Sequence, residues 1–343
     1  MTIGLVRASR SIIWTGAGAR ACQALEHRAP RKPWGLQPAG VSMRSVASDS
    51  RVLCITSGKG GVGKTTTAAS IGMGLALKGK KTCVIDFDIG LRNLDIHLGA
   101  ERRVIFDFVH VLQGDCTLKQ AMIKDKRNPN LFLLAASQTK DKNALTVDAV
   151  GKMLAEMRRE FDFIICDSPA GIESGARHAM YFADDAIIVT NPELSSCRDS
   201  DKMIGFISSR SKRAELGQEP VRQSLLVTRY DPERAQKEEC LRLEDIKELL
   251  GLELLGVIPE SKCILTATNL GQPVICMPDQ DAGQAYMDTV ERFLGEEKEF
   301  RFLSPRPTGI LSMLFSRGTE RARSAAYLIL YVLSSFYVRD QTY

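Results

Sequence analysis

The chain lacks the residue patterns that build disulfide frameworks and metal clusters. Its nine cysteines are scattered with no C-x-x-C pair, and its four histidines show no ligand spacing. These absences argue against a disulfide scaffold and a zinc site, and they favour a reducing compartment. Cys54, Cys83 and Cys166 fall in predicted buried strands, where a free thiol behaves as a small apolar side chain.

Acidic residues are almost absent from residues 1–48, which hold one Glu against seven Lys or Arg. Removing this surplus from the formal net charge of +5 leaves about −1 for the rest of the chain. A nearly neutral body does not favour nucleic-acid binding, so no nucleic-acid partner is expected. Residues 1–48 instead read as an organellar targeting segment that is cleaved off, because they are Arg-rich with interspersed apolar residues. The early arginines and modest serine content favour a mitochondrion, with a plastid as the alternative.

Linkers and internal repeats are also lacking between residue 51 and about residue 295. Apolar runs alternate there with helical stretches, which is typical of βαβ units. We therefore predict one α/β domain with a mostly parallel sheet and helices on both faces. The predicted strands are 51–57, 82–87, 131–135, 161–167, 185–190, 223–228 and 254–258, and the predicted helices include 65–78, 147–160, 199–213 and 241–250.

A glycine-rich segment connects the first predicted strand to the first predicted helix, as in a P-loop NTPase. Its glycines allow backbone N–H groups to cradle phosphate oxygens, and the helix N-terminus favours an anion. Lys64 would reach the β- and γ-phosphates, and the Thr65 hydroxyl would take one Mg²⁺ position. The segment reads Gly58-Lys59-Gly60-Gly61-Val62-Gly63-Lys64-Thr65.

Acidic residues follow two further predicted strands, at the sheet edge where ligands of parallel sheets bind. Asp86 and Asp88 come after the second strand, and Asp167 ends another apolar strand. Carboxylates in these places can hold a metal-bound water or orient the attacking water in phosphoryl transfer. Gly171 follows Asp167 closely and would let the loop backbone approach a γ-phosphate.

These segments resemble the MinD family of septum-placing ATPases, within the ParA/MinD group that carries a deviant Walker loop. The resemblance covers residues 51–303. It implies ATP and Mg²⁺ as cofactors and a homodimer when ATP is bound. The matching segments are 58–66, 84–95, 166–173, 191–193, 198–201, 226–230 and 256–260.

The resemblance also implies roles for individual residues in phosphate chemistry. Lys59 would contact nucleotide across the dimer interface. Lys64, Thr65 and Thr66 would bind the phosphates and Mg²⁺. Asp88 would position the hydrolytic water.

Further implied roles concern the metal, the switch and the base. Asp86 and Asp167 would support the metal, and Asn93 would lie in a switch region near the dimer interface. The adenine would lie where the chain has Thr228, Arg229 and Pro259.

The chain beyond the predicted domain, 49–303, resembles the membrane-targeting tail of the family. A linker at 304–308 contains two prolines and precedes a segment at 309–318. This segment predicts an amphipathic helix that binds an anionic membrane weakly until two copies are paired in a dimer. The alternative is a last helix that docks on the core, which the proline linker disfavours. The apolar stripe is Ile310, Leu311, Leu314 and Phe315.

Residues 319–343 form an extension that the family does not lead us to expect. They include an apolar run at 325–338, which is shorter than the roughly 20 residues of a membrane-spanning helix. The run either strengthens membrane attachment or is an artefact of the gene model.

The function predicted from these features is that of an ATP-hydrolysing membrane switch that positions the division site of an organelle, on the inner face of its inner membrane. A MinC-type inhibitor and a MinE-type activator would be its partners. A ParA-type DNA-partitioning ATPase is the alternative, but it would need a basic surface, and the body of this chain is nearly neutral. An iron–sulfur carrier would need paired cysteines at a dimer axis, and no cysteines are suitably placed here. A scaffold that binds ATP without turnover is disfavoured by Lys64, Asp88 and Asp167.

Overall fold

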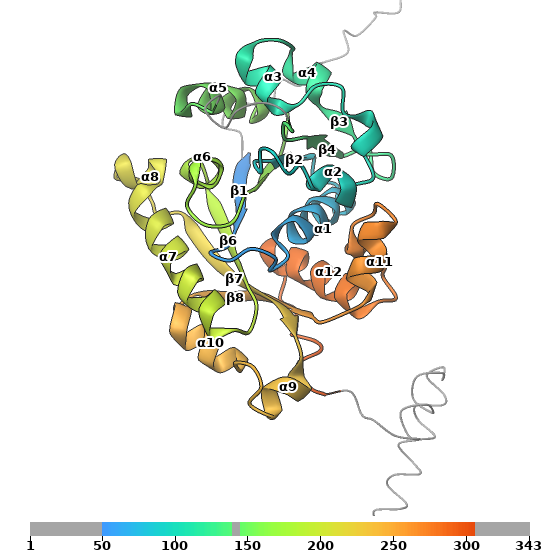
Figure 1. Cartoon of the computed structure of the whole chain (residues 1–343), viewed down its shortest axis with the longest axis vertical. Coiled ribbons are helices and arrows are strands. Elements are labelled where there is room, and N and C mark those ends of the chain that lie inside the picture. The colour runs from blue at the N-terminus through green and yellow to red at the C-terminus, as the bar shows by residue number, and fades with distance from the viewer. Residues whose placement is uncertain (1–49, 139–144, 306–343) are drawn as a thin grey trace, which may run out of the picture. The chain divides into compact units, whose positions relative to one another are not determined.

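The computed structural model describes residues 50–138 and 145–305. All described residues belong to one compact unit of the chain. These residues form an eight-stranded sheet flanked by helices (Figure 1), which confirms the predicted fold class. The targeting segment, most of the linker, the membrane stripe and the apolar extension lie outside the described residues, so their boundaries stay predictions.

The strand order is β3-β4-β2-β5-β1-β6-β7-β8. All neighbouring strands are parallel except β3 and β4. Strands β2 to β5 lie on one side of β1, and strands β6 to β8 lie on the other. The strand order therefore reverses at β1, and ligands of parallel sheets bind at the carboxyl end of the strands at such a point. The strands are β1 Arg51–Thr56, β2 Thr82–Asp86, β3 Ile123–Lys124, β4 Leu131–Leu134, β5 Phe163–Asp167, β6 Asp185–Thr190, β7 Arg222–Tyr230 and β8 Glu253–Pro259.

The helices cover both faces of this sheet and make separate cores with it. The α-helices are α1 Lys64–Leu77, α2 Leu94–His97, α3 Phe108–Gln113, α4 Leu118–Ala121, α5 Val147–Met157, α6 Ser174–Tyr181, α7 Leu194–Arg210, α8 Lys212–Glu215, α9 Pro232–Gln236, α10 Leu243–Leu250, α11 Cys263–Asn269 and α12 Asp281–Phe293, and the short 3₁₀ helices are η1 Glu101–Arg103 and η3 Val274–Cys276.

Successive strand residues point to opposite faces, and β1 shows the consequence. Leu53 and Ile55 join the core beneath α1 and α12, which lie together in Figure 1. Val52 and Cys54 join the opposite core beneath α5 and α6. Because both faces are covered, the strands read as nearly continuous apolar runs, as predicted.

The predicted helix 199–213 is wrong at both ends. Helix α7 already begins at Leu194, directly after Glu193, and it ends at Arg210. Ser211 then adopts an extended backbone, and its side chain accepts a hydrogen bond from the Ala214 N–H, which starts the separate helix α8. Such local capping by serine competes with helix continuation.

Two further observations complete the fold. The edge strand β3 has only two residues and pairs antiparallel with β4, so it left no recognisable apolar run in the sequence. In the part of the chain that the structure describes, no helix is both long and apolar enough to cross a membrane.

Candidate nucleotide-binding and hydrolysis site

The glycine-rich loop leaves β1 and ends at the N-terminus of α1. Gly63 precedes α1 with a φ of 95°, a left-handed conformation in which a side chain would be strained. Gly58 packs against α7 so closely that a Cβ there would lie 2.2 Å from the carbonyl carbon of Asp199. The loop therefore needs glycine at both ends, and it presents the first N–H groups of α1 at the reversal point of the sheet.

Lys64 lies folded against its own loop. Its Nζ donates a hydrogen bond to Ser57 Oγ at 2.9 Å and to the Lys59 carbonyl oxygen at 3.4 Å. Burial lowers the pKa of Lys64, while the charges of Asp167 and Asp88 oppose this shift. The lysine predicted to bind phosphate is therefore buried within electrostatic reach of both carboxylates. Ser57, which holds it, was not singled out from the sequence, although its place directly after β1 was a usable signal.

Asp167 ends β5 and is 2% exposed. Thr65 donates a hydrogen bond to Asp167 that favours the charged form of the carboxylate. The Oδ1 atom of Asp167 has no hydrogen-bond partner among the described residues. Burial, followed by the charge of Asp86, raises the pKa of Asp167 well above its ordinary value. This carboxylate is short of compensating positive charge, which is the condition that a bound cation relieves.

Asp86 lies beside Asp167, because the two residues are register partners in β2 and β5. Its Oδ1 accepts the Asp88 N–H at 2.9 Å, and its Oδ2 accepts the Leu94 N–H at 3.2 Å. Burial raises the pKa of Asp86 to about 7, against the effect of these two bonds. Asp86 thus holds the segment that carries Asp88 at two points, the N–H groups of Asp88 and Leu94. Its predicted role in metal support stays a prediction, since both oxygens already serve the backbone.

The donor set fits a magnesium ion that arrives with a nucleotide. Among the described residues, no group of three or more His, Cys, Asp or Glu is arranged to hold a metal alone. Mg²⁺ commonly binds through one or two protein oxygens together with substrate phosphates and waters. The unpartnered Oδ1 of Asp167 and the neighbouring Thr65 hydroxyl match that pattern.

Lys59 turns away from its own loop. Its Nζ donates to Glu193 Oε2 at 2.5 Å and to Ser195 Oγ at 3.2 Å, both at the start of α7. The hydrogen bond from Lys59 lowers the pKa of Glu193. Glu193 belongs to the Asn191-Pro192-Glu193 segment at the end of β6, and sequence reasoning gave it no role. Its signal was its position after a further parallel strand.

Residues 88–97, called the switch turn here after the role predicted for Asn93, contact the first turn of α1. Asn93 precedes α2, and its carbonyl oxygen lies 3.0 Å from His97 Nδ1. His97 Nε2 in turn lies 3.3 Å from Thr66 Oγ1 in the first turn of α1. A histidine outside any ligand motif gave no sequence signal for this contact. On the other side of the loop, the Gly171 N–H donates to the Ser57 carbonyl oxygen at 3.0 Å.

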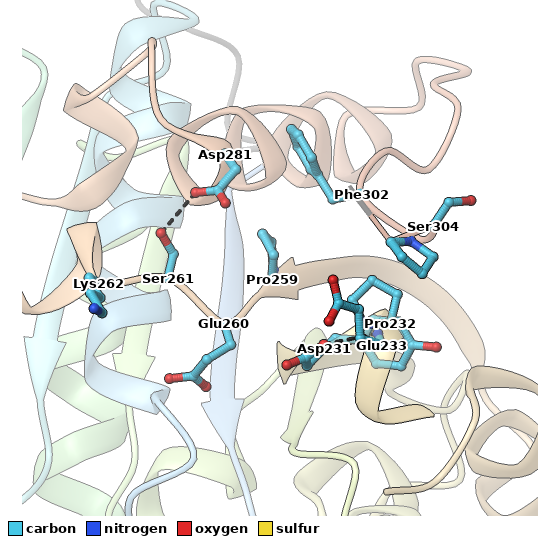
Figure 2. A pocket seen from close by; sticks show the side chains of 12 residues that line it. Asp231, Pro232, Glu233, Pro259, Glu260, Ser261, Lys262, Asp281, Phe302 and Ser304 are labelled. Atoms are coloured by element: carbon cyan, nitrogen blue, oxygen red, sulfur yellow. Dashed lines mark hydrogen bonds between the residues drawn. The ribbon is translucent and has the colours of Figure 1, made fainter. Parts of the chain in front are cut away.

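The residues predicted to hold adenine lie at the carboxyl ends of β7 and β8. Thr228 Oγ1 donates to the Val62 carbonyl oxygen at 2.7 Å, which joins β7 to the loop. Arg229 has a φ of 52°, and Pro259 lines a cavity of about 400 Å³ (Figure 2). Figure 2 shows this cavity between the β7–α9 turn, the β8–α11 loop and the chain at Phe302 and Ser304. The structure brings the three residues to one sheet edge, and base binding there stays a prediction.

A buried lysine in a glycine-rich loop, beside carboxylates on neighbouring parallel strands, defines a P-loop ATPase. A family model described as an AAA domain matches residues 50–216. The septum site-determining protein MinD of Escherichia coli (strain K12) is 59% identical over 266 residues, which cover 77% of this chain and 98% of that protein. The chain belongs to the MinD family of septum site-determining, cell-division ATPases.

Solved structures of the family agree with this assignment. The MinC:MinD cell division protein complex of Aquifex aeolicus contains a chain that is 40% identical with a TM-score of 0.64, covering 73% of this chain and 98% of that one. The septum site-determining protein MinD of Pyrococcus horikoshii OT3, complexed with Mg-ADP, is 28% identical with a TM-score of 0.62, covering 71% of this chain and 96% of that one.

Proposed function

We propose that this protein is an ATP-driven membrane switch that positions the division site of an organelle. The observation that carries the proposal is the buried, incompletely paired carboxylate of Asp167 beside Thr65 and Lys64. A buried charge of this kind destabilises the nucleotide-free protein unless it serves a ligand. Membership of the MinD family supplies the division-site role.

The chemistry of the site follows from its residues. Lys64 would bind the β- and γ-phosphates, and Thr65 and Asp167 would hold Mg²⁺. The Mg-ADP complex of the Pyrococcus relative supports a magnesium nucleotide as the ligand. Bound Mg²⁺ neutralises charge that develops on the phosphates. Asp88 is held by Asp86 at the turn after β2 and positions the attacking water. Most of the acceleration then comes from positioning and electrostatics.

Dimer formation gives Lys59 its role in this scheme. In the monomer, its Nζ is engaged at the start of α7 rather than at its own loop. A homodimer that encloses ATP would release Lys59 from Glu193 and offer it to the partner's nucleotide. Two weakly binding tail helices, with their stripe at Ile310, Leu311, Leu314 and Phe315, then act together on an anionic membrane.

The partners and the location complete the proposal. A MinC-type inhibitor is supported by the MinC:MinD complex of the Aquifex relative, and a MinE-type activator would stimulate hydrolysis. The Arg-rich residues 1–48 direct the protein to a mitochondrion, with a plastid as the alternative, and the switch acts on the inner face of the inner membrane.

Phosphate release and oligomeric mass test the enzymatic half of the proposal. The full chain should release phosphate from ATP only with Mg²⁺ present, and its mass in solution should double with ATP but not with ADP. Asp88→Asn keeps the shape of the turn residue but removes the charge that orients water, so hydrolysis should fall about a hundredfold while the ATP-bound dimer persists. Magnesium-independent turnover, or a mass that ignores the nucleotide, would contradict the scheme.

A further inference from the structure

His97 makes two contacts that join the switch turn to the phosphate-binding helix. It is the last residue of α2, a helix of only four residues. Its Nδ1 lies 3.0 Å from the Asn93 carbonyl oxygen within the turn, and its Nε2 lies 3.3 Å from Thr66 Oγ1 on α1. The ring is half-buried between these two elements.

The two partners determine which ring nitrogen carries the proton. A carbonyl oxygen can only accept, so Nδ1 must donate to Asn93. Burial lowers the pKa of His97, although the Asn93 carbonyl and the charge of Asp95 oppose this shift, and the neutral ring therefore has Nε2 as an acceptor. The Thr66 hydroxyl then donates to His97 Nε2. The single proton of the Thr66 hydroxyl is therefore bonded to His97 in the switch turn. The backbone N–H of Thr66 remains to bind a phosphate.

The His97 contact with Thr66 is a tether that lies three residues beyond Leu94, the last residue of the switch turn whose N–H is bonded to Asp86. Asp86 fixes the first part of that turn through the Asp88 and Leu94 N–H groups. Helix α2 begins at Leu94, whose N–H is bonded to Asp86, and a helix of four residues has little stability of its own. The His97–Thr66 hydrogen bond thus connects this turn with the same helical turn that contains Lys64 and Thr65.

We propose that His97 is a positioning residue which, through the Thr66 hydroxyl, sets the place of the Asp88 turn relative to the bound phosphates. The proposal deepens the proposed function and rests on it for the role of Asp88. A positioning residue of this kind acts on the rate of hydrolysis more than on ATP affinity, because Lys64 and backbone N–H groups bind the phosphates independently. Misplacement of a water-orienting group by even 1 Å can reduce turnover strongly.

Three variants of His97 separate its two contacts. His97→Gln places an amide oxygen where Nε2 stands, so it can still accept from Thr66. His97→Asn reaches only as far as Nδ1, so it keeps the contact within the turn and loses Thr66. His97→Leu loses both. We expect His97→Gln to hydrolyse saturating ATP within about twofold of the natural chain, and the other two to be about five- to tenfold slower, as for one lost hydrogen bond.

ATP affinity and a double-mutant cycle complete the test. The Kd for ATP should change less than about twofold in all three variants. Thr66→Val should slow hydrolysis about as much as His97→Leu does, and the pair together should be no slower than either change alone. Additive effects, a loss of affinity in place of rate, or full activity of His97→Asn would overturn the proposal.

Hydrogen exchange of the nucleotide-free full chain tests the tether without turnover. Amides of residues 88–97 should exchange faster in His97→Asn and His97→Leu than in the natural chain and His97→Gln. Unchanged exchange would overturn the tether even if the chain is an active ATPase. Faster exchange in a chain that does not hydrolyse ATP would keep the tether and reject the proposed function.

Discussion

At the scale of single residues, the two lysines of the loop have opposite surroundings. Lys64 is buried and bonded within the loop, whereas Lys59 is more than a third exposed and paired with Glu193. The same residue type thus serves two purposes five positions apart. The motif predicted the first environment from its spacing, but the partner of Lys59 comes from another strand end, which spacing within the loop cannot reveal.

Asp167 gives a prediction about stability at this scale. Its folded-state pKa is raised above the ordinary value of 3.8. The folded protein therefore holds this proton to higher pH than the unfolded chain does, and its stability falls as pH rises through that window. Asp167→Asn removes the buried charge, so the nucleotide-free variant should be more stable than the natural chain at pH 7 by about 1–3 kcal/mol.

The measurement is urea unfolding at pH 5 and pH 7, with and without Mg-ATP. The gain should shrink at the lower pH, where the natural carboxyl is protonated more often. Mg-ATP should stabilise the natural chain more than the variant, because the variant retains Lys64 and the loop N–H groups but lacks the Asp167 charge. A variant less stable than the natural chain at pH 7 would show that Asp167 serves packing rather than a cation.

At the scale of elements, the loop packs closely against α7 at Gly58. A Cβ at Gly58 would lie 2.2 Å from backbone atoms of Asp199, whereas a Cβ at Gly60 would meet nothing within 4 Å. Neither has a positive φ, so the pair differs in space and not in backbone strain. Gly58→Ala should lower the free energy of unfolding by about 1–3 kcal/mol, because the backbone of α7 must shift, and Gly60→Ala by less than about 1 kcal/mol.

Thermal unfolding of both glycine variants without nucleotide checks this difference. Equal melting temperatures would mean that the loop and α7 are not packed as described. The loop position that lets Lys59 reach Glu193 would then be in question as well.

The elements also show what the sequence could and could not predict. Apolar runs located β1, β2, β5 and β6 closely, because both faces of these strands are buried. Capping explains the wrong C-terminal end of the predicted helix 199–213: Ser211 divides it, and this depends on a local hydrogen bond with little periodic signal. The sequence predicted the phosphate loop after β1 and Asp167 at the end of β5, because both follow apolar runs. It did not predict His97 and Glu193, because they contact Thr66 and Lys59 from distant segments of the chain.

At the scale of the whole molecule, the proposed switch couples a nucleotide site to a tail that follows the described domain. The last described residues, including Phe302, Ser304 and Pro305, line the cavity that also contains Pro259. The chain therefore leaves the domain beside the strand ends where the base is predicted to bind (Figure 2). This places the beginning of the linker near the site whose occupancy the tail is proposed to report.

Co-sedimentation with anionic vesicles tests the membrane switch most directly. The full chain, and a version truncated after Arg306, would be spun with vesicles in ATP and in ADP. We expect the full chain to pellet in ATP, to stay largely in solution in ADP, and to lose pelleting on truncation. Pelleting in both nucleotides would instead make the apolar extension a constant anchor. Absence of pelleting in ATP would contradict the membrane switch and return DNA partitioning to consideration.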